Sequence, residues 1–240
     1  MRYDKAMDLK TEGFSIPTKG TGISRLTGLL REPFCGISHF TGAALSLVGL
    51  VALLTKAHGD PLRIVAFSLY GGSLVLLYLA SAFAHSVRAG QQLFEWLCRF
   101  DYIGIFLLVA GTCAPFCLLV LHGALGWTLF GVIYGLASLG IANVLFSLQT
   151  PHWKRIIVYF LMGLTMLVAV GPLLTLVPHA ALIWMLVGGL VYAVGVTIMV
   201  VEKPSLWPGR FNAHDLWHIF VLAASACHFY AIWRYIALAP

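Results

Sequence analysis

Five long stretches of this chain contain no lysine, arginine, aspartate or glutamate, and they constrain the fold more than any other feature. The uncharged runs cover residues 33–55, 64–87, 102–153, 156–201 and 216–233. A mostly apolar run of about 18 or more residues is typical of a helix that spans a lipid bilayer. The chain is 60% apolar and only 10% charged, whereas an average soluble domain is roughly 45–50% apolar and 25% charged. We therefore expect an integral membrane protein and exclude an ordinary soluble enzyme.

Two of the runs are too long for a single span. As one helix, residues 102–153 would measure about 78 Å, more than twice the hydrocarbon thickness of about 30 Å. Two glycines interrupt the apolar pattern within residues 122–126. Pro178 interrupts the run 156–201, because proline lacks a backbone N–H and disfavours helix in the residue before it. Splitting both runs predicts an all-α bundle of seven transmembrane helices. The predicted spans are residues 36–55, 64–87, 101–121, 126–147, 156–176, 182–201 and 214–236.

The positions of the basic residues predict the orientation of the bundle. Of the fifteen lysines and arginines, twelve fall in the N-terminal segment and in the second, fourth and sixth connections. Cytoplasmic segments carry an excess of Lys and Arg, so we predict a cytoplasmic N-terminus, an external C-terminus and a multi-pass protein of the cell inner (plasma) membrane. Residues 1–31 would form a cytoplasmic tail with an interfacial turn near 23–30, and residues 32–240 the transmembrane domain. The net charge of +6 is thus a topology signal, since nucleic-acid binding would need a soluble basic face.

Several ionisable side chains fall at one level of the predicted bundle. Such groups are costly within a membrane unless they are paired, so each is a candidate functional residue. His85 ends the second span at the cytoplasmic side, and Ser81 lies one turn away on the same face of that helix. Asp101 opens the third span at this side, and His214 and His218 open the seventh span one turn apart. The predicted topology therefore brings residues from distant parts of the chain together.

The types and spacing of these side chains point to metal chemistry. Two histidines four residues apart on a helix present two nitrogens on one face. A third imidazole from a facing helix would leave the fourth tetrahedral position for water, as in catalytic zinc sites. We therefore interpret His85, His214 and His218 as candidate ligands of Zn²⁺. Asp101 would orient a water molecule or act as a general base, and Ser81 would be a polar neighbour or contact a substrate carbonyl.

Other interpretations of the histidines stay open at this point. Histidines at helix ends also hydrogen-bond to lipid headgroups or to backbone, and ligand type alone does not separate zinc from iron or manganese. We expect His39 and His228 to make local hydrogen bonds, although haem ligation by two of His39, His85 and His228 is an alternative. The remaining histidines lie in predicted connections, where a solvated role is expected: His58, His122, His152 and His179. The five cysteines indicate no disulfide framework and suit apolar packing.

Three motifs around the candidate site carry a family resemblance. They are Ser-Ala-Phe-Ala-His-Ser at 81–86, Phe-Asp-Tyr-Ile-Gly-Ile at 100–105 with the segment 110–116, and His-Asp-Leu-Trp-His-Ile-Phe-Val at 214–221. Together with Glu32 and His39, they resemble the hemolysin III family, the bacterial branch of the progestin and adipoQ receptor group. That family usually has asparagine four residues before the histidine equivalent to His39, and Cys35 stands there in this chain.

The resemblance implies a fold, a metal and an activity. It implies seven transmembrane helices, a zinc ion bound by the equivalents of His85, His214 and His218, Asp101 holding a water molecule and Ser81 close by. The wider superfamily includes alkaline ceramidases, which implies a metal-dependent hydrolase of a lipid amide or ester, with a membrane lipid as substrate and a part in membrane lipid homeostasis. The alternative is a pore-forming, haemolytic protein or a non-catalytic membrane sensor with a structural zinc.

Overall fold

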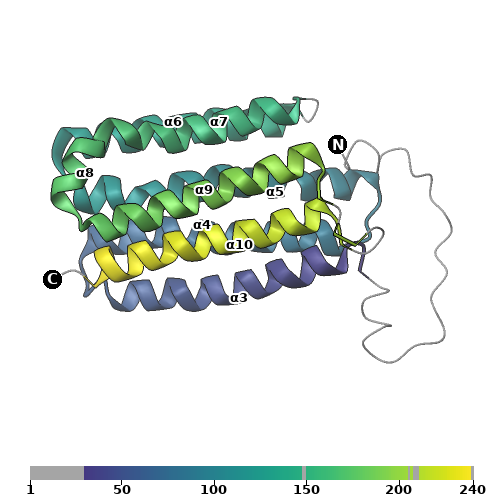
Figure 1. Cartoon of the computed structure of the whole chain (residues 1–240), viewed down its shortest axis with the longest axis horizontal. Helices are drawn as coiled ribbons and strands as arrows, with labels where there is room; N and C mark the ends of the chain where they lie inside the picture. Colours follow the sequence, from purple (N-terminus) through teal and green to yellow (C-terminus); the bar gives the residue numbers. More distant parts are fainter. Residues whose placement is uncertain (1–29, 148–149, 205, 208–210, 239–240) are drawn as a thin grey trace.

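The computed structural model describes residues 30–147, 150–204, 206–207 and 211–238, which form a bundle of long helices (Figure 1). Among these residues, seven helices are long and apolar enough to cross a membrane, which confirms the predicted all-α, seven-helix architecture. The predicted N-terminal tail and its interfacial turn lie outside the described residues, apart from residues 30–31. The seven spans are Pro33–Thr55, Pro61–Ser86, Gln91–Val120, Gly123–Phe146, His152–Leu176, His179–Val201 and Ala213–Ala237.

Prolines and capping side chains set where several helices begin. Helices α3 (Pro33–Thr55) and α4 (Pro61–Ser86) each have proline in the first turn, where a backbone N–H would have no partner within the helix. The Asp60 carboxylate accepts hydrogen bonds from N–H groups in the first turn of α4. Helix α10 (Ala213–Ile232) begins with a capping box built on Asn212. These local signals determine which residues lie at each end of the bundle.

The two predicted breaks in the long apolar runs are observed. Helix α6 (Gly123–Phe146) begins directly after His122, and both His122 and Gly123 have positive φ angles, of 43° and 60°. This backbone conformation favours glycine and reverses the direction of the chain. Helix α9 (His179–Val201) begins directly after Pro178, as predicted. Each long run therefore forms two antiparallel spans.

The third span begins earlier than predicted. Helix α5 (Gln91–Pro115) starts at Gln91 rather than at residue 101, so Asp101 lies within the helix and does not open it. The prediction was wrong because it placed the start of the helix at the edge of the uncharged run. Arg99 is accommodated inside α5, since its guanidinium donates hydrogen bonds to the backbone carbonyls of Val144 and Leu145 at the end of α6. A cation at the C-terminal end of a helix is favourable.

Two prolines inside spans are followed or preceded by irregular helix. After Pro115 the third span continues as a π-helical segment, Phe116–Val120. Before Pro172 lies a 3₁₀ segment, Thr165–Ala169, because the proline nitrogen cannot donate to the carbonyl four residues earlier. The fifth span thus consists of helix α7 (His152–Leu164), this 3₁₀ segment and helix α8 (Val170–Leu176).

Helix α4 packs against both α3 and α5. Its side chains Phe67, Tyr70 and Tyr78 are almost completely buried, together with Phe106 of α5. In contrast, only 11% of an 18-residue apolar stretch of α9 is buried, whereas the corresponding share in the third span is 67%. A soluble monomer rarely exposes so much apolar surface, so the outer faces of such helices suit contact with lipid.

Glycines let some helices approach closely, and in two glycine pairs only one member is used in this way. A Cβ atom at Gly71 of α4 would lie 2.7 Å from Leu50 of α3, and one at Gly188 of α9 would collide with the ring of His228. The neighbouring Gly72 and Gly189 have no heavy atom within 4 Å of such a Cβ. One glycine of each pair therefore faces a neighbouring helix.

Candidate metal centre

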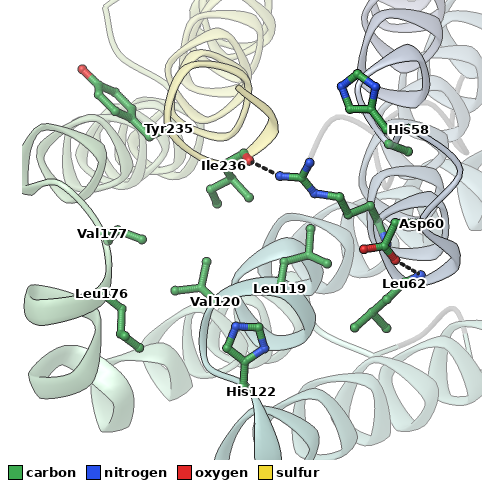
Figure 2. Close-up of a pocket in the computed structure, with 12 residues that line it drawn as sticks. His58, Asp60, Leu62, Leu119, Val120, His122, Leu176, Val177, Tyr235 and Ile236 are labelled. Carbon is green, nitrogen blue, oxygen red and sulfur yellow. Dashed lines mark hydrogen bonds between the residues drawn. The ribbon is translucent and has the colours of Figure 1, made fainter. Parts of the chain in front are cut away.

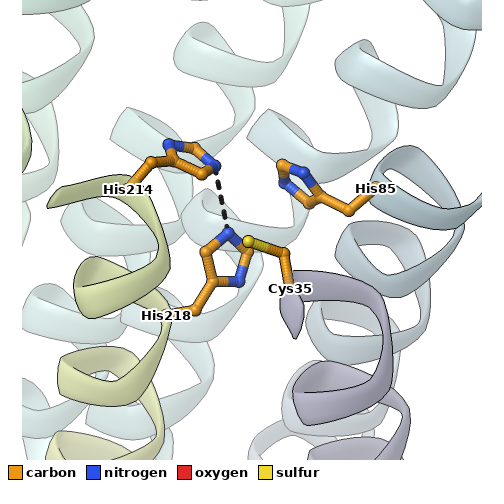
Figure 3. Close-up of side chains that lie close together, drawn as sticks. All are labelled: Cys35, His85, His214 and His218. Atoms are coloured by element: carbon orange, nitrogen blue, oxygen red, sulfur yellow. Dashed lines mark hydrogen bonds between the residues drawn. The ribbon is translucent and has the colours of Figure 1, made fainter. Parts of the chain in front are cut away.

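Three helix ends meet at one end of the bundle, namely the starts of α3 and α10 and the end of α4 (Figure 1). They bring together the side chains of Cys35, His85, His214 and His218 (Figure 3). One donor atom from each side chain lies within 4.8 Å of the donor atoms of the other three. Within the described ranges, this is the group of histidine, cysteine or acidic side chains close enough to share one metal ion.

The capping box of α10 positions the two histidines of that helix. The Asn212 side chain accepts a hydrogen bond from the backbone N–H of His214 at 2.9 Å, and Asp215 accepts one from the N–H of Asn212 at 2.8 Å. These bonds fix the first helical turn. His218 follows His214 by one turn, so both rings project from the same face of α10. The cap thus holds two of the four donors.

The spacing of the two rings fits a shared metal ion. The Nε2 atoms of His214 and His218 lie 3.1 Å apart. With Zn–N bonds of about 2.0–2.1 Å, two nitrogens of a tetrahedral zinc site lie about 3.3 Å apart. The other ring nitrogen of His218, Nδ1, lies 2.9 Å from Nε2 of His39. A metal-ligating histidine commonly donates its second N–H to such a partner, which fixes the ring orientation.

His85 is oriented by Glu32, which precedes the first span. The backbone N–H of Glu32 donates to the carbonyl of His85 at 2.9 Å, and its carboxylate Oε2 lies 2.6 Å from Nδ1 of the same histidine. Since an ionised carboxylate only accepts, Nδ1 donates and Nε2 is left to face the other donors. Burial alone would raise the pKa of Glu32, but the hydrogen bond from His85 and the nearby positive charge of Arg31 lower it to about 2. Glu32 is therefore ionised near neutral pH.

Asp101 and Ser81 lie beside the four donors but are not members of that group. The Oδ2 atom of Asp101 is 3.9 Å from Nε2 of His85. The Ser81 hydroxyl, one turn before His85 on α4, hydrogen-bonds to the Asp101 carboxylate. The structure thus brings all five predicted site residues to the same end of the bundle, with the three imidazoles in one group and the carboxylate next to His85.

Cys35 has polar contacts that were not predicted from the sequence. Its side chain is almost completely buried, and Sγ donates a hydrogen bond to Oδ1 of Asp215 at 3.1 Å. The sequence predicts apolar packing for the cysteines, and the burial of Cys35 alone would suit that role. The available signal was its position four residues before His39, which places both side chains on one face of α3.

His39 and His228 make the local contacts expected of them. His39 contacts His218, as described above, and its own Nδ1 has no hydrogen-bond partner among the described residues. His228 lies farther along α10, and its Nε2 hydrogen-bonds to the backbone carbonyl of Met185 at 3.0 Å. His228 therefore links α10 to α9 and stands apart from the four donors.

A cavity of about 630 Å³ lies at the opposite end of the bundle (Figure 2). His58 and His122, both expected in connections, line it. On its wall, the Arg63 guanidinium donates a hydrogen bond to the backbone carbonyl of Ile236 at 3.1 Å. The cavity is separated from Cys35 and the three clustered histidines by the length of the helices, so it plays no part in the candidate metal centre.

Comparisons with known proteins agree with this architecture. A family model described as Haemolysin-III related matches residues 27–229, which include all four donors. Hemolysin-3 of Bacillus cereus is 36% identical over 219 residues, which cover 89% of this chain and 96% of that protein. The Hemolysin-3 homolog of Bacillus subtilis is 34% identical over 208 residues, covering 85% and 93%. The adiponectin receptor protein of Drosophila melanogaster is 25% identical over 237 residues, covering 86% of this chain and 49% of that protein.

Proposed function

The chain belongs to the haemolysin-III related family, and on that premise we propose that it is a zinc-dependent hydrolase of a lipid amide or ester. It would act in the plasma membrane and contribute to membrane lipid homeostasis. The observation that carries the proposal is the meeting of His85, His214 and His218 beside a carboxylate, at the end of an otherwise apolar bundle. Ionisable groups gathered at membrane depth are costly unless they serve a site.

The three imidazoles would hold the metal through their Nε2 atoms. For His214 and His218 these atoms already face each other, and for His85 the bond to Glu32 occupies Nδ1. Bound Zn²⁺ supplies a Lewis acid that brings the pKa of water toward about 7 and polarises a carbonyl oxygen. Imidazole donors suit this ion well.

Asp101 is the proposed general base. Its Oδ2 atom lies next to His85, where it can accept a proton from the attacking water and return that proton to the leaving amine or alcohol. Ser81 would position this carboxylate, because its hydroxyl already hydrogen-bonds to Asp101. The water oxygen would end on the acyl carbon of the lipid, while the leaving group would gain the proton.

The depth of the site suits a lipid substrate. The lysine and arginine distribution predicts that this end of the bundle faces the cytoplasm. The amide or ester group of a lipid lies where the headgroup meets the acyl chains, which is also where the helix ends lie. The apolar outer faces of the helices would let the acyl chains stay in the bilayer while the polar group reaches the site.

The interior of the bundle favours a hydrolase over a pore formed by one copy of the chain. The centre between α3, α4 and α5 is filled by large side chains, among them Phe67, Tyr70 and Phe106. A water-filled conduit would instead be lined by polar or charged groups. The word haemolysin in the names of the bacterial relatives describes those proteins, and the packed core of this chain does not form such a conduit within the described residues.

The proposal is tested with purified protein in liposomes that contain a panel of ceramides and phospholipids. We expect metal-dependent release of fatty acid from at least one lipid class, and a loss of about 10²–10⁴-fold in Asp101→Asn, the range for removal of a general base. Asp60→Asn, at the opposite end of the bundle, is the matched control and should retain activity. Metal-loaded wild-type protein that hydrolyses none of the lipids would favour the non-catalytic sensor.

A further inference from the structure

We propose that Cys35 is a fourth protein ligand, so that the metal is held by one thiolate and three imidazoles. This inference rests on the metal site of the proposed function and goes beyond it, because that site has three histidine ligands and an open position. The donor set would come from α3, α4 and α10, and it would tie together the three helix ends that meet there (Figure 3).

The first argument is geometric. The sulfur of Cys35 is within 4.8 Å of the donor nitrogens of His85, His214 and His218, which is the same limit that relates the nitrogens to one another. In Figure 3 the thiol projects toward the ring of His218, between the ends of α4 and α10. The Cys35 side chain is 1% exposed. A thiol directed at three imidazoles in a buried position is therefore available to the same ion.

The second argument is the local structure that brings Cys35 to this position. Helix α3 starts at Pro33, so Cys35 lies in its first turn. The next residue, Gly36, packs against the end of α4, where a Cβ atom would collide with the hydroxyl of Ser86. The absence of a side chain at Gly36 thus lets the first turn of α3 lie directly against the helix end that carries His85.

The third argument is chemical. The Cys35 thiol donates to Oδ1 of Asp215, a weak hydrogen bond from sulfur. On metal binding the S–H bond would break, a sulfur–metal bond would form, and the proton would leave to solvent with Asp215 as the nearest acceptor. Thiolate and imidazole together are the preferred donors of zinc. The metal bond therefore replaces a weak interaction with a strong one.

A set of four protein donors has a functional consequence. Zinc sites with four protein ligands are closed, whereas catalytic zinc sites keep one position for water or substrate. With Cys35 bound, the centre is a resting state, and hydrolysis requires the thiolate to leave the metal. Cys35 would then control access of water to the site rather than take part in the chemistry.

Cobalt substitution tests this inference through a signal that does not depend on activity. Co²⁺ bound by a thiolate gives an intense sulfur-to-metal charge-transfer band in the near ultraviolet, which three imidazoles alone do not give. We expect the band in the wild-type protein and its loss in Cys35→Ala. That variant should still bind Co²⁺ through the histidines, but its affinity for Co²⁺ should be lower by about 10- to 100-fold. Loss of a side chain that only hydrogen-bonds to a ligand already has an effect of this size.

The controls separate the possible outcomes. Cys227→Ala removes a cysteine of α10 outside the four donors and should keep the band. Stoichiometric Co²⁺ without the band in the wild type would overturn the role of Cys35 and leave the three-histidine site intact. A wild-type protein that binds no Co²⁺ would overturn the metal site itself. The wild-type spectrum is decisive even if Cys35→Ala does not fold.

Discussion

The carboxylate of Glu32 lies 2.6 Å from Nδ1 of His85, although the two residues are 53 positions apart in the sequence. The bond joins the residue that precedes the first span to the end of the second span. It selects the imidazole tautomer in which Nε2 is free of hydrogen and faces the other donors. Glu32 is therefore a positioning residue for the candidate metal centre, and it acts through His85.

We predict that Glu32→Gln weakens metal binding without abolishing it. The neutral amide accepts a weaker hydrogen bond and stabilises the metal-bound imidazole less, so the affinity for Co²⁺ should fall by about 10- to 100-fold. Titration of the purified protein with Co²⁺ measures this change. Glu95→Gln is the matched control, because the Glu95 carboxylate lies away from the four donors and accepts a hydrogen bond from Gln91 of the same helix. Equal affinities for the wild type and Glu32→Gln would contradict the assigned role.

The contact between α3 and α4 predicts unequal effects for two adjacent glycines. Gly71→Ala would place a methyl group 2.7 Å from the Leu50 side chain and 3.1 Å from its Cα atom. We expect this variant to be destabilised by about 1–3 kcal/mol, as is typical of overpacking. Unfolding in a denaturing detergent, followed by circular dichroism, measures the difference.

Gly72→Ala is the matched control for this substitution, since no heavy atom lies within 4 Å of the added Cβ. It should be neutral or slightly stabilising, because alanine has fewer conformations than glycine in the unfolded chain. If both variants lost the same stability, the result would contradict the close contact between Gly71 of α4 and Leu50 of α3.

The distribution of basic residues predicts that the two termini lie on opposite sides of the membrane. A fluorescent protein fused to the N-terminus should fluoresce, and alkaline phosphatase fused to the C-terminus should be active, because the first folds in the cytoplasm and the second outside it. An inactive C-terminal phosphatase fusion, together with a fluorescent C-terminal fusion, would place the C-terminus in the cytoplasm and contradict this prediction. If the N-terminal fusion also fluoresced, the number of spans would be even rather than seven.

The depth of each site residue could be predicted from the sequence because the bilayer fixes the length of a span. His85, His214 and His218 are at span ends in the sequence, and antiparallel helices that cross the same bilayer bring those ends to one level. The breaks near Gly123 and Pro178 followed from the same reasoning. The start of α5 could not be found in this way, because Arg99 is tolerated in a helix through its bonds to the end of α6.

The rotation of each helix about its axis is what the sequence did not reveal. Cys35 occurs in an apolar run and has the size of a packing residue, so only its direction toward the three imidazoles distinguishes it from the other cysteines. Glu32 precedes the first span, and its role depends on the backbone bond that it makes to His85. Both contacts arise from packing between helices, which hydropathy and charge patterns do not encode.

Metal analysis of the purified protein tests the central claim most directly. We predict about one zinc ion per chain in the wild type and none in His214→Ala/His218→Ala. A double variant of two histidines at the opposite end, His58→Ala/His122→Ala, should retain zinc at the wild-type level. Wild-type protein purified without chelators that contains no stoichiometric metal, and that takes up none when zinc is added, would contradict the account.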